Sequence, residues 1–376
     1  MNLGGSGVVA SGWNVNATVS DCEFKWLGEC AVIGAGLGGD AHDNSAPSAP
    51  VGRGLTLQRN LAHELGLFVK QSGFYYHAMG ANASVLENVF FNGARAGINI
   101  NDGFGGGHEI SRNVGFNMVV RLRGARGPCS LPAPLPSPSL PLPPSPSPPS
   151  PPQRETSDHG PINTWDRNTY AWRTGPGGTD ALPSRISRNL LHANYHSVTA
   201  LDHDDGSNGW VDTENVLLWS GTKNLMGYNK RSQGNLFVYV DYNPALLLRG
   251  GGGAQRIGWS APETKPAMCA GYLTPFPSAT AQADAWVNNS CIAASNVSLF
   301  RFPACNSSNP LDGSIPVPLA GNSYYTTNAS YQMRCGGEVW GLPQAQARGV
   351  DVGATLHALP STEQLLGMAR QLLQLQ

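Results

Sequence analysis

Short runs in which apolar and polar residues alternate recur along most of this chain. Clear examples are residues 85–92 and 235–240, and Gly or Asn interrupts each run after a few positions. An alternation of period two predicts a β-strand, whereas a helix repeats its apolar residues every three or four positions. Before the C-terminus, no run carries an amphipathic pattern of roughly ten residues, the length of a short helix. The pattern therefore predicts many short strands joined by tight turns.

A short motif marks these strands: a charged residue, then Asn, then Leu or Val. Where the chain is uninterrupted, the copies return about every 20 to 28 residues. A period of this size is typical of solenoids and propellers. We therefore expect a repeat protein. The copies are Arg59-Asn60-Leu61, Glu87-Asn88-Val89, Arg112-Asn113-Val114, Arg188-Asn189-Leu190, Glu214-Asn215-Val216 and the weaker Gly234-Asn235-Leu236.

The content of one repeat indicates which fold to expect. A coil of about 25 residues with two or three short strands fits a parallel β-helix, whose strands stack about 4.8 Å apart. A propeller is the competing fold, but its blades need four strands and about 40 residues. We predict one all-β domain, a right-handed parallel β-helix (solenoid) over residues 1–376. The motif Asn is expected to occupy a left-handed corner and to bond the Asn of the next coil in a ladder.

Three segments depart from this pattern. Residues 121–153 are rich in Pro and Ser and are expected to form a disordered inserted loop, since Pro cannot supply ladder hydrogen bonds. A wall-type arm and a retained intron both fit that composition. Residues 243–359 are predicted to hold looser coils and Cys-bearing loops. Residues 361–375 are predicted to form a short C-terminal helix, because Ser361 and Gln364 make a capping box before apolar residues at helical spacing.

Charge and hydropathy exclude two classes of partner. The chain has 24 basic and 25 acidic residues and a net charge of −1, so it lacks the basic surface that nucleic-acid binding requires. It has no apolar stretch of about 18 residues, so no membrane span is expected. We also expect a monomer.

Cysteines and glycosylation motifs indicate an extracellular setting. The chain has 7 cysteines, and Asn-x-Ser/Thr occurs at six positions, four of them in the same region as most of the cysteines. Together they favour an oxidising compartment, and we expect a protein secreted to the extracellular matrix or cell wall. No signal peptide is visible, so we expect an N-terminally incomplete chain. The six positions are Asn16, Asn82, Asn288, Asn296, Asn306 and Asn328.

Residues at equal distance from each ladder Asn should lie above one another. About 12 to 15 residues after each Asn, polar side chains recur once residues 121–153 are set aside. This predicts a stripe with carboxylates about 5 to 10 Å apart on neighbouring coils. Turn formation is the plainer explanation for any single Asp, but a column of acids suits acid and base chemistry, or Ca²⁺. The stripe contains Tyr75, Asp102, Asp158, His159, Asp202, His203, Asp204, Asp205, Tyr228 and Lys230, with Trp165, Asp166 and Arg167 as a wall.

Three stretches of this chain resemble the right-handed β-helix proteins of the pectate-lyase-like superfamily. They are residues 95–106, 158–167 and 202–207. The resemblance implies kinship with polysaccharide lyases, polygalacturonase-type hydrolases and alginate epimerases. The string Asp202-His203-Asp204-Asp205 is similar to the Asp-Pro-His-Asp string of the epimerases, without its Pro. The Pro/Ser segment resembles the hydroxyproline-rich segments of green-algal wall proteins.

Two hypotheses follow. The first is a secreted carbohydrate-active enzyme, a lyase, epimerase or hydrolase, acting on an acidic polysaccharide. In a lyase or epimerase, Ca²⁺ on Asp202, Asp204 or Asp205 neutralises the uronate, and His203 or Lys230 takes the C5 proton. In a hydrolase, Asp158 protonates the leaving oxygen while Asp204 or Asp205 activates water. The second is a non-catalytic wall or adhesion module that binds glycans.

The expected site residues fall into three groups. The catalytic residues are Asp158, His159, His203, Asp204, Asp205 and Lys230; the substrate-binding residues are Tyr75, Asp102, Trp165, Asp166, Arg167 and Tyr228; the metal ligands are Asp202, Asp204 and Asp205.

Overall fold

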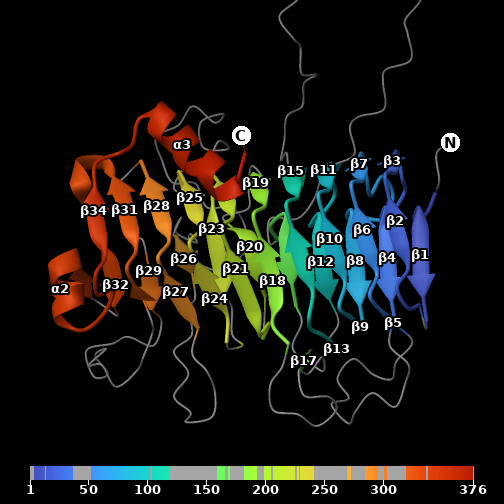
Figure 1. The fold of residues 1–376 in the computed structure, drawn as a ribbon, viewed down its shortest axis with the longest axis horizontal. Coiled ribbons are helices and arrows are strands. Elements are labelled where there is room, and N and C mark those ends of the chain that lie inside the picture. The colour runs from blue at the N-terminus through green and yellow to red at the C-terminus, as the bar shows by residue number, and fades with distance from the viewer. Residues whose placement is uncertain are drawn as a thin grey trace, which may run out of the picture.

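The structure is a computed structural model. It describes residues 4–12, 14–36, 52–101, 104–118, 159–165, 168–169, 182–192, 199–204, 206–224, 227, 229–240, 269–271, 284–294, 300–302, 319–335 and 338–375. The chain winds in coils that stack along one long axis, from the N-terminal coil at one end to α2 at the other (Figure 1). The segment 121–153 and residues 243–268 lie outside the described residues.

The coils contribute one strand to each of three long sheets in the same order, except that the last coil gives no strand to the second sheet. All strand pairs in these sheets are parallel except β32 with β33. This confirms the predicted all-β parallel β-helix. The first sheet contains β1 (Val8–Ser11), β4 (Val32–Ala35), β8 (Tyr75–Ala78), β12 (Ile98–Asn101), β16 (Ile162–Thr164), β20 (Thr199–His203), β23 (Gly221–Asn224), β26 (Ala270–Gly271), β29 (Phe300–Phe302), β32 (Met333–Cys335) and β33 (Glu338–Trp340).

The other two long sheets form the remaining sides of the coil, and two strand pairs lie at its corners. The second sheet contains β2 (Thr18–Ser20), β6 (Thr56–Gln58), β10 (Ser84–Leu86), β14 (Glu109–Ser111), β18 (Ser184–Ser187), β21 (Trp210–Thr213), β24 (Arg231–Gln233), β27 (Ala285–Val287) and β30 (Leu319–Ala320). The third contains β3 (Glu23–Lys25), β7 (Leu61–His63), β11 (Val89–Gly93), β15 (Val114–Met118), β19 (Leu190–His192), β22 (Val216–Leu218), β25 (Leu236–Val238), β28 (Ser290–Ala293), β31 (Ser323–Thr326) and β34 (Thr355–His357). The corner pairs are β5 (Gly52–Arg53) with β9 (Gly80–Ala81) and β13 (Phe104–Gly105) with β17 (Asn168–Thr169).

The predicted Asn ladder is confirmed. Each ladder Asn is buried, and its side-chain amide donates to the Oδ1 atom of the next Asn at 2.9 to 3.0 Å. Two further members, Asn289 and Asn322, extend it. The sequence prediction missed them because Ser follows each of them, where the motif has Leu or Val, and neither comes after a charged residue. The six predicted members are Asn60, Asn88, Asn113, Asn189, Asn215 and Asn235.

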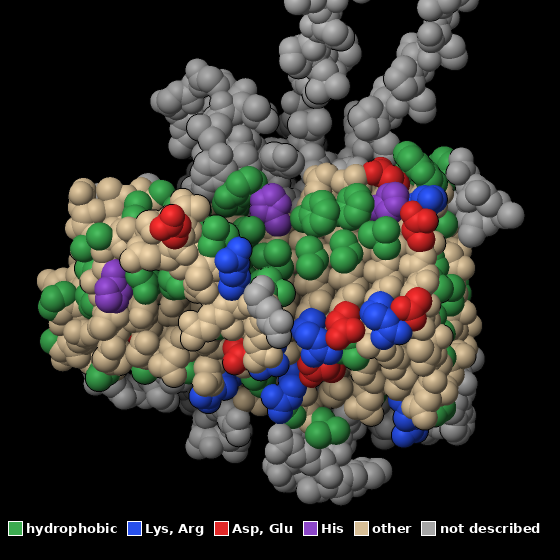
Figure 2. Space-filling view, turned by 45° about the horizontal axis from the view of Figure 1, so that its top comes forward, with side chains coloured by type: hydrophobic (Ala, Val, Ile, Leu, Met, Phe, Trp, Pro, Cys, Tyr) green, Lys and Arg blue, Asp and Glu red, His purple; other side chains and the backbone are tan. Residues whose placement is uncertain are grey.

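The left-handed corner is one residue earlier than predicted. The residue before each ladder Asn has the positive φ, for example 53° at Arg59 and 58° at Glu87. The ladder Asn can therefore point its amide inward while the preceding side chain points to solvent. These exposed side chains form ion pairs between coils, such as Arg59 with Asp21 and Arg112 with Glu87. Figure 2 shows the paired basic and acidic side chains on this face.

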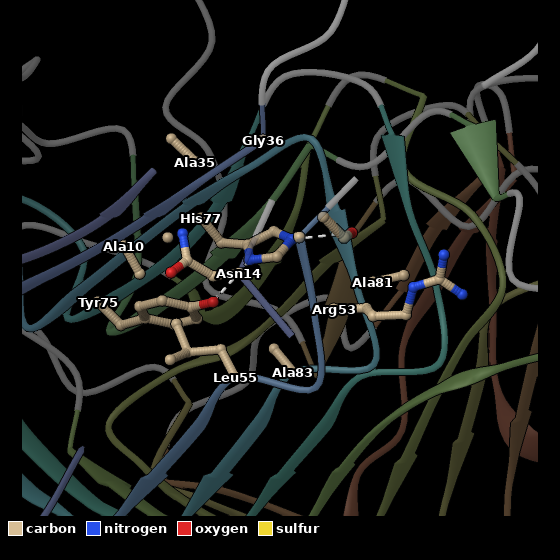
Figure 3. A pocket seen from close by; sticks show the side chains of 13 residues that line it. Ala10, Asn14, Ala35, Gly36, Arg53, Leu55, Tyr75, His77, Ala81 and Ala83 are labelled. Atoms are coloured by element: carbon tan, nitrogen blue, oxygen red, sulfur yellow. Dashed lines mark hydrogen bonds between the residues drawn. The ribbon is translucent and has the colours of Figure 1, made fainter. Parts of the chain in front are cut away.

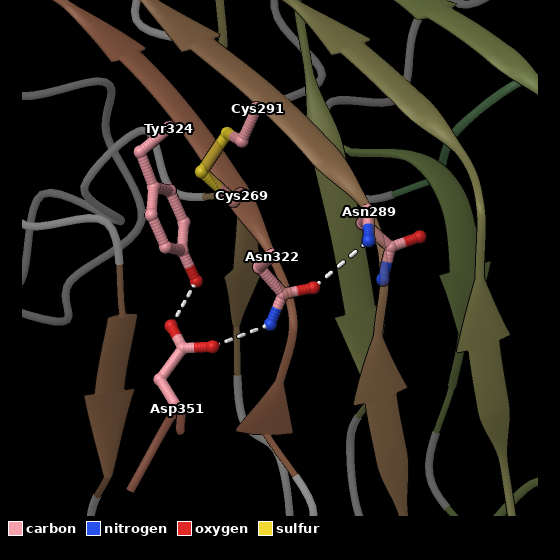
Figure 4. The surroundings of a disulfide bond; sticks show 6 residues. All are labelled: Cys269, Asn289, Cys291, Asn322, Tyr324 and Asp351. Atoms are coloured by element: carbon pink, nitrogen blue, oxygen red, sulfur yellow. Dashed lines mark hydrogen bonds between the residues drawn. A yellow bond between two sulfur atoms is a disulfide. The ribbon is translucent and has the colours of Figure 1, made fainter. Parts of the chain in front are cut away.

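The C-terminal coils close with a buried carboxylate. Asn322 donates through Nδ2 to Asp351 Oδ1 at 2.8 Å, and the Tyr324 hydroxyl donates to Oδ2 of the same carboxylate. Figure 4 shows this end of the ladder beside the Cys269–Cys291 disulfide, which joins the edge of β26 to β28. Burial raises the pKa of Asp351. The final coil thus offers an acceptor to the last ladder amide.

Two helices cover the C-terminal half. The predicted C-terminal helix is present as α3 (Thr362–Leu373), with Ser361 as its N-cap and Gln364 completing the capping box. Its apolar face packs on the outer side of the third sheet, over Leu218 and Val238. The helix α2 (Leu342–Ala347) was not predicted; it buries Leu342 and Ala345 against the last coil, and a turn at Thr327–Ala329 precedes β32. No helix among the described residues is long and apolar enough to cross a membrane.

Candidate functional site

The first sheet carries a column of polar side chains on its outer face. Ile98, Ile162 and Leu201 of this sheet pack in the core, so the residues that follow them must point outward. The strand register places those residues above one another. All except the first are nearly inaccessible to solvent, although they point away from the interior. The column contains Tyr76, Asn99, Asn163, Asp202 and Lys223.

A lysine joins two carboxylates in this column. Asp202 and Asp204 lie two residues apart, and the backbone N–H of Asp204 donates to the Thr164 carbonyl, so both stay on the outer face. Lys223 Nζ lies 3.0 Å from Asp202 Oδ1 and 2.7 Å from Asp204 Oδ1. The Asp202 side chain is fully buried, whereas that of Asp204 is 18% exposed. Asp204 is therefore the carboxylate nearest to solvent.

His159, in the turn before β16, completes the cluster. Its Nδ1 atom lies 3.3 Å from Asp202 Oδ2, and its Nε2 atom lies 2.6 Å from Arg95 Nη2. A guanidinium can only donate hydrogen bonds, so Nε2 accepts and the proton of the neutral ring lies on Nδ1, facing Asp202. Asn163 Nδ2 lies 3.2 Å from the same Nδ1 atom, but both atoms carry protons in this tautomer, so the Nδ1 proton is left for Asp202. The Asp202 carboxylate thus orients the imidazole of His159, and the lone pair on Nε2 faces Arg95.

The described members of this cluster do not fit Ca²⁺ well. His159, Asp202 and Asp204 can bring one ligand atom each within 4.8 Å of one another. Calcium, however, takes six to eight oxygen ligands, and one of these three atoms is nitrogen. The Lys223 ammonium also lies where a cation would neutralise both carboxylates. A calcium ion there would have to displace Lys223.

His203 and Lys230 lie inside the helix, away from this cluster. Alternation along β20 turns His203 inward, where its Nε2 atom lies 2.8 Å from Asp212 Oδ2 and its Nδ1 atom 2.8 Å from Thr164 Oγ1. Lys230 Nζ lies 3.3 Å from Asp284 Oδ2. Burial lowers the pKa of Lys230, and the Asp284 charge opposes this. Both side chains are almost inaccessible, so the structure separates them from Asp202 and Asp204.

Tyr75 also faces the interior. Its hydroxyl lies 2.6 Å from His77 Nδ1, and His77 Nε2 lies 3.0 Å from the Gly80 carbonyl, to which it must donate. The Tyr75 hydroxyl is therefore the donor to Nδ1. Burial lowers the pKa of His77 to about 4 and raises that of Tyr75. Both line a small pocket between the first coils, together with Leu55 and Arg53 (Figure 3). Two strands, β12 and β16, separate Tyr75 from β20.

The structure thus brings together three of the predicted residues, His159, Asp202 and Asp204. Trp165 is level with Asp204, because each follows an inward-facing residue of the register pair Thr164 and His203. The other predicted site residues lie outside the described residues. They are Asp102, Asp158, Asp166, Arg167, Asp205 and Tyr228.

Sequence reasoning missed three members, Arg95, Asn163 and Lys223. Counting from the ladder Asn fails for Lys223, because it follows Asn215 by 8 residues while Asp202 follows Asn189 by 13. The coils differ in loop length, so equal offsets do not give equal register. Residues 221–224 show no alternation of apolar and polar residues, so only the strand register, which pairs Lys223 with Asp202, places this lysine in the column.

A scan against protein-family models, a search of curated proteins and a search of solved structures found no match to this chain.

Proposed function

We propose that this protein is a secreted β-helical enzyme of the pectate-lyase-like superfamily that acts on an acidic polysaccharide by removing the C5 proton of a uronate, as a lyase or epimerase. The observation that carries the proposal is the cluster of Arg95, His159, Asp202, Asp204 and Lys223 on the outer face of the first sheet. It combines an oriented base with two cations that could neutralise a uronate carboxylate.

The charge arrangement favours proton abstraction over hydrolysis. A hydrolase needs one carboxyl group that is protonated and can donate to the leaving oxygen. Lys223 pairs with both Asp202 and Asp204, so both carboxylates of this cluster are held in ion pairs and neither is placed as a separate acid. His159, in contrast, has a free lone pair on Nε2 once Arg95 turns toward another anion.

The proposed step follows from these contacts. The uronate carboxylate of the substrate draws Arg95 away from His159 and approaches Lys223. His159 Nε2 then takes the proton from C5, and Asp202 stabilises the resulting imidazolium through Nδ1. In a lyase, the electron pair forms the C4–C5 double bond as the bond from C4 to the glycosidic oxygen breaks, and water supplies a proton to that oxygen. In an epimerase, a water molecule on the opposite face gives a proton to C5, and the hydroxide left behind takes the proton held by His159.

The column suits a linear polymer. Its five strands span roughly 20 Å along the axis at the spacing of parallel strands, so a glycan lying along the axis would contact several coils. Among the described residues, neither side-chain amide atom of the buried Asn99 has a hydrogen-bond partner. Buried polar groups are normally paired, so this amide would pair with a sugar hydroxyl only after the chain around the column moves aside. Secretion is supported by the Cys269–Cys291 disulfide, since such bonds persist in oxidising compartments.

A non-catalytic glycan-binding module is the second candidate. It is favoured by the burial of Asp202 and by its pairing with Lys223, because a structural ion pair has the same contacts.

The substitution Asp204→Asn distinguishes the enzyme from the non-catalytic module. We expect it to lower turnover of a polyuronate by about 10²-fold or more while leaving the fold intact, because Asp204 holds the Lys223 ammonium that meets the uronate carboxylate. The control is Glu87→Gln, an acid of the exposed ion pairs. An unchanged rate in Asp204→Asn would refute the assignment.

A further inference from the structure

We infer that Asn16, Asn82, Asn288 and Asn328 are N-glycosylation sites whose glycans project from the corners of the coils. The inference rests on the secretion part of the proposed function. Each of these residues begins an Asn-x-Ser/Thr motif. The hydroxyl residues that complete the four motifs are Thr18, Ser84, Ser290 and Ser330.

Exposure separates these residues from the other asparagines that the structure describes. Among the asparagines whose side chains the structure describes, these four are the exposed ones, and the rest are buried or half-buried. The ladder asparagines, such as Asn113, are held inside by hydrogen bonds between side-chain amides, and none of them begins an Asn-x-Ser/Thr motif. The motif therefore coincides with the places where a bulky polar substituent can leave the surface.

The four motif asparagines share one backbone conformation and keep their side chains out of the hydrogen-bond network of the described residues. All four have a left-handed conformation, with φ of 55° at Asn16, 53° at Asn82, 53° at Asn288 and 59° at Asn328. Two left-handed asparagines without the motif, Asn92 and Asn117, use their side chains within the fold: Asn117 Nδ2 donates to Asn92 Oδ1. No side-chain hydrogen bond to described residues is formed by the four motif asparagines.

The neighbouring coil leaves room for the asparagine at two of these corners. A Cβ atom on Gly54 would lie 2.3 Å from Asn16 Oδ1, and one on Gly321 would lie 2.3 Å from Asn288 Oδ1. Glycine at these positions therefore lets the side chain extend over the next coil. None of the four asparagines lies in a strand of the first sheet, so the glycans would not project from the outer face that carries Asp202 and Lys223.

The experiment is to secrete the full chain from a eukaryotic host behind a leader peptide and to map glycopeptides by mass spectrometry. Enzymatic release of the glycan converts each occupied Asn to Asp and marks it. We expect all four positions to be marked, and each single Asn→Gln variant to carry one glycan fewer. Thr18→Ala should have the same effect as Asn16→Gln, since it removes the acceptor motif but keeps the asparagine.

The matched control is Asn117→Gln, which changes a left-handed asparagine without the motif and should leave the glycan count unchanged. If the host retains the chain, the count is read after translation into microsomes. A translocated chain with all four asparagines unmodified would overturn the inference. Because the readout is mass, it needs no enzymatic activity, and an inactive but glycosylated protein would count only against the proposed function.

Discussion

Two adjacent residues show how strand geometry assigns chemistry at the residue scale. Asp202 and His203 stand together in the sequence, and their residue types alone suggest a single site. In β20 they point to opposite sides, so Asp202 joins Lys223 outside and His203 joins Asp212 inside. The sequence could predict that Asp202 and His203 belong to polar clusters. It could not predict which residues they contact, because those contacts depend on the register between coils of unequal length.

The role of His159 gives the first prediction. His159→Gln should lower the turnover of a polyuronate by at least about 10²-fold, because the amide cannot take the C5 proton. The measurement is the steady-state rate with the protein's stability checked in parallel. The matched control is His192→Gln, a half-buried histidine on the third sheet, which should keep its rate. Equal losses in both variants would contradict a specific role for His159.

The buried His77 gives a prediction on pH dependence. Its pKa is about 4 in the folded protein, against an ordinary value of 6.5. Between these values the unfolded chain binds the proton and the folded chain does not, so stability rises with pH. The contribution, about 3 kcal/mol, is complete above the unfolded pKa and is lost as pH falls toward 4.

The measurement for His77 is the free energy of unfolding by denaturant across this pH range, in wild type and in His77→Gln. The variant should show a shallower dependence on pH. Some dependence should remain, because burial also lowers the pKa values of His108 and His192. An identical slope in the two proteins would show that His77 does not titrate as the structure implies.

At the element scale, the coil is the unit that the sequence specifies best. The motif copies predicted six ladder positions correctly, since a buried amide that must bond to its copy tolerates no other side chain. The prediction was wrong for two features that depend on local backbone geometry. It assigned the left-handed conformation to the Asn, whereas residues such as Arg59 and Glu87 adopt it. It also missed α2, which is too short for helical periodicity to show.

The ladder yields a stability prediction. Asn113→Ala removes two donated and two accepted hydrogen bonds inside the stack and leaves the Asn88 amide without its acceptor. We expect a loss of about 2 to 4 kcal/mol in the free energy of unfolding. The measurement is chemical denaturation. The neighbouring exposed residue provides the control, because Arg112→Ala breaks only a surface ion pair and should cost little. Equal costs would mean that the ladder adds no more than the surface.

At the scale of the whole molecule, the fold could be predicted further than the function. Repeat length, alternation and turn residues point to one architecture, and the three long parallel sheets confirm it. The set of side chains on the outer face of the first sheet is known only once the coils are stacked. That stacking brings Arg95, His159 and Lys223 together from three different coils, and no local pattern in the sequence links them.

The most direct measurement is to incubate the purified protein with a panel of polyuronates and follow the ultraviolet absorbance of unsaturated products, with C5 epimerisation read by NMR and new reducing ends assayed alongside. Wild type should give unsaturated or epimerised product from at least one polyuronate, and His159→Gln should not. New reducing ends without unsaturation would contradict proton abstraction and indicate hydrolysis. Glycan binding with no product in any assay would contradict the enzyme proposal and leave the non-catalytic module.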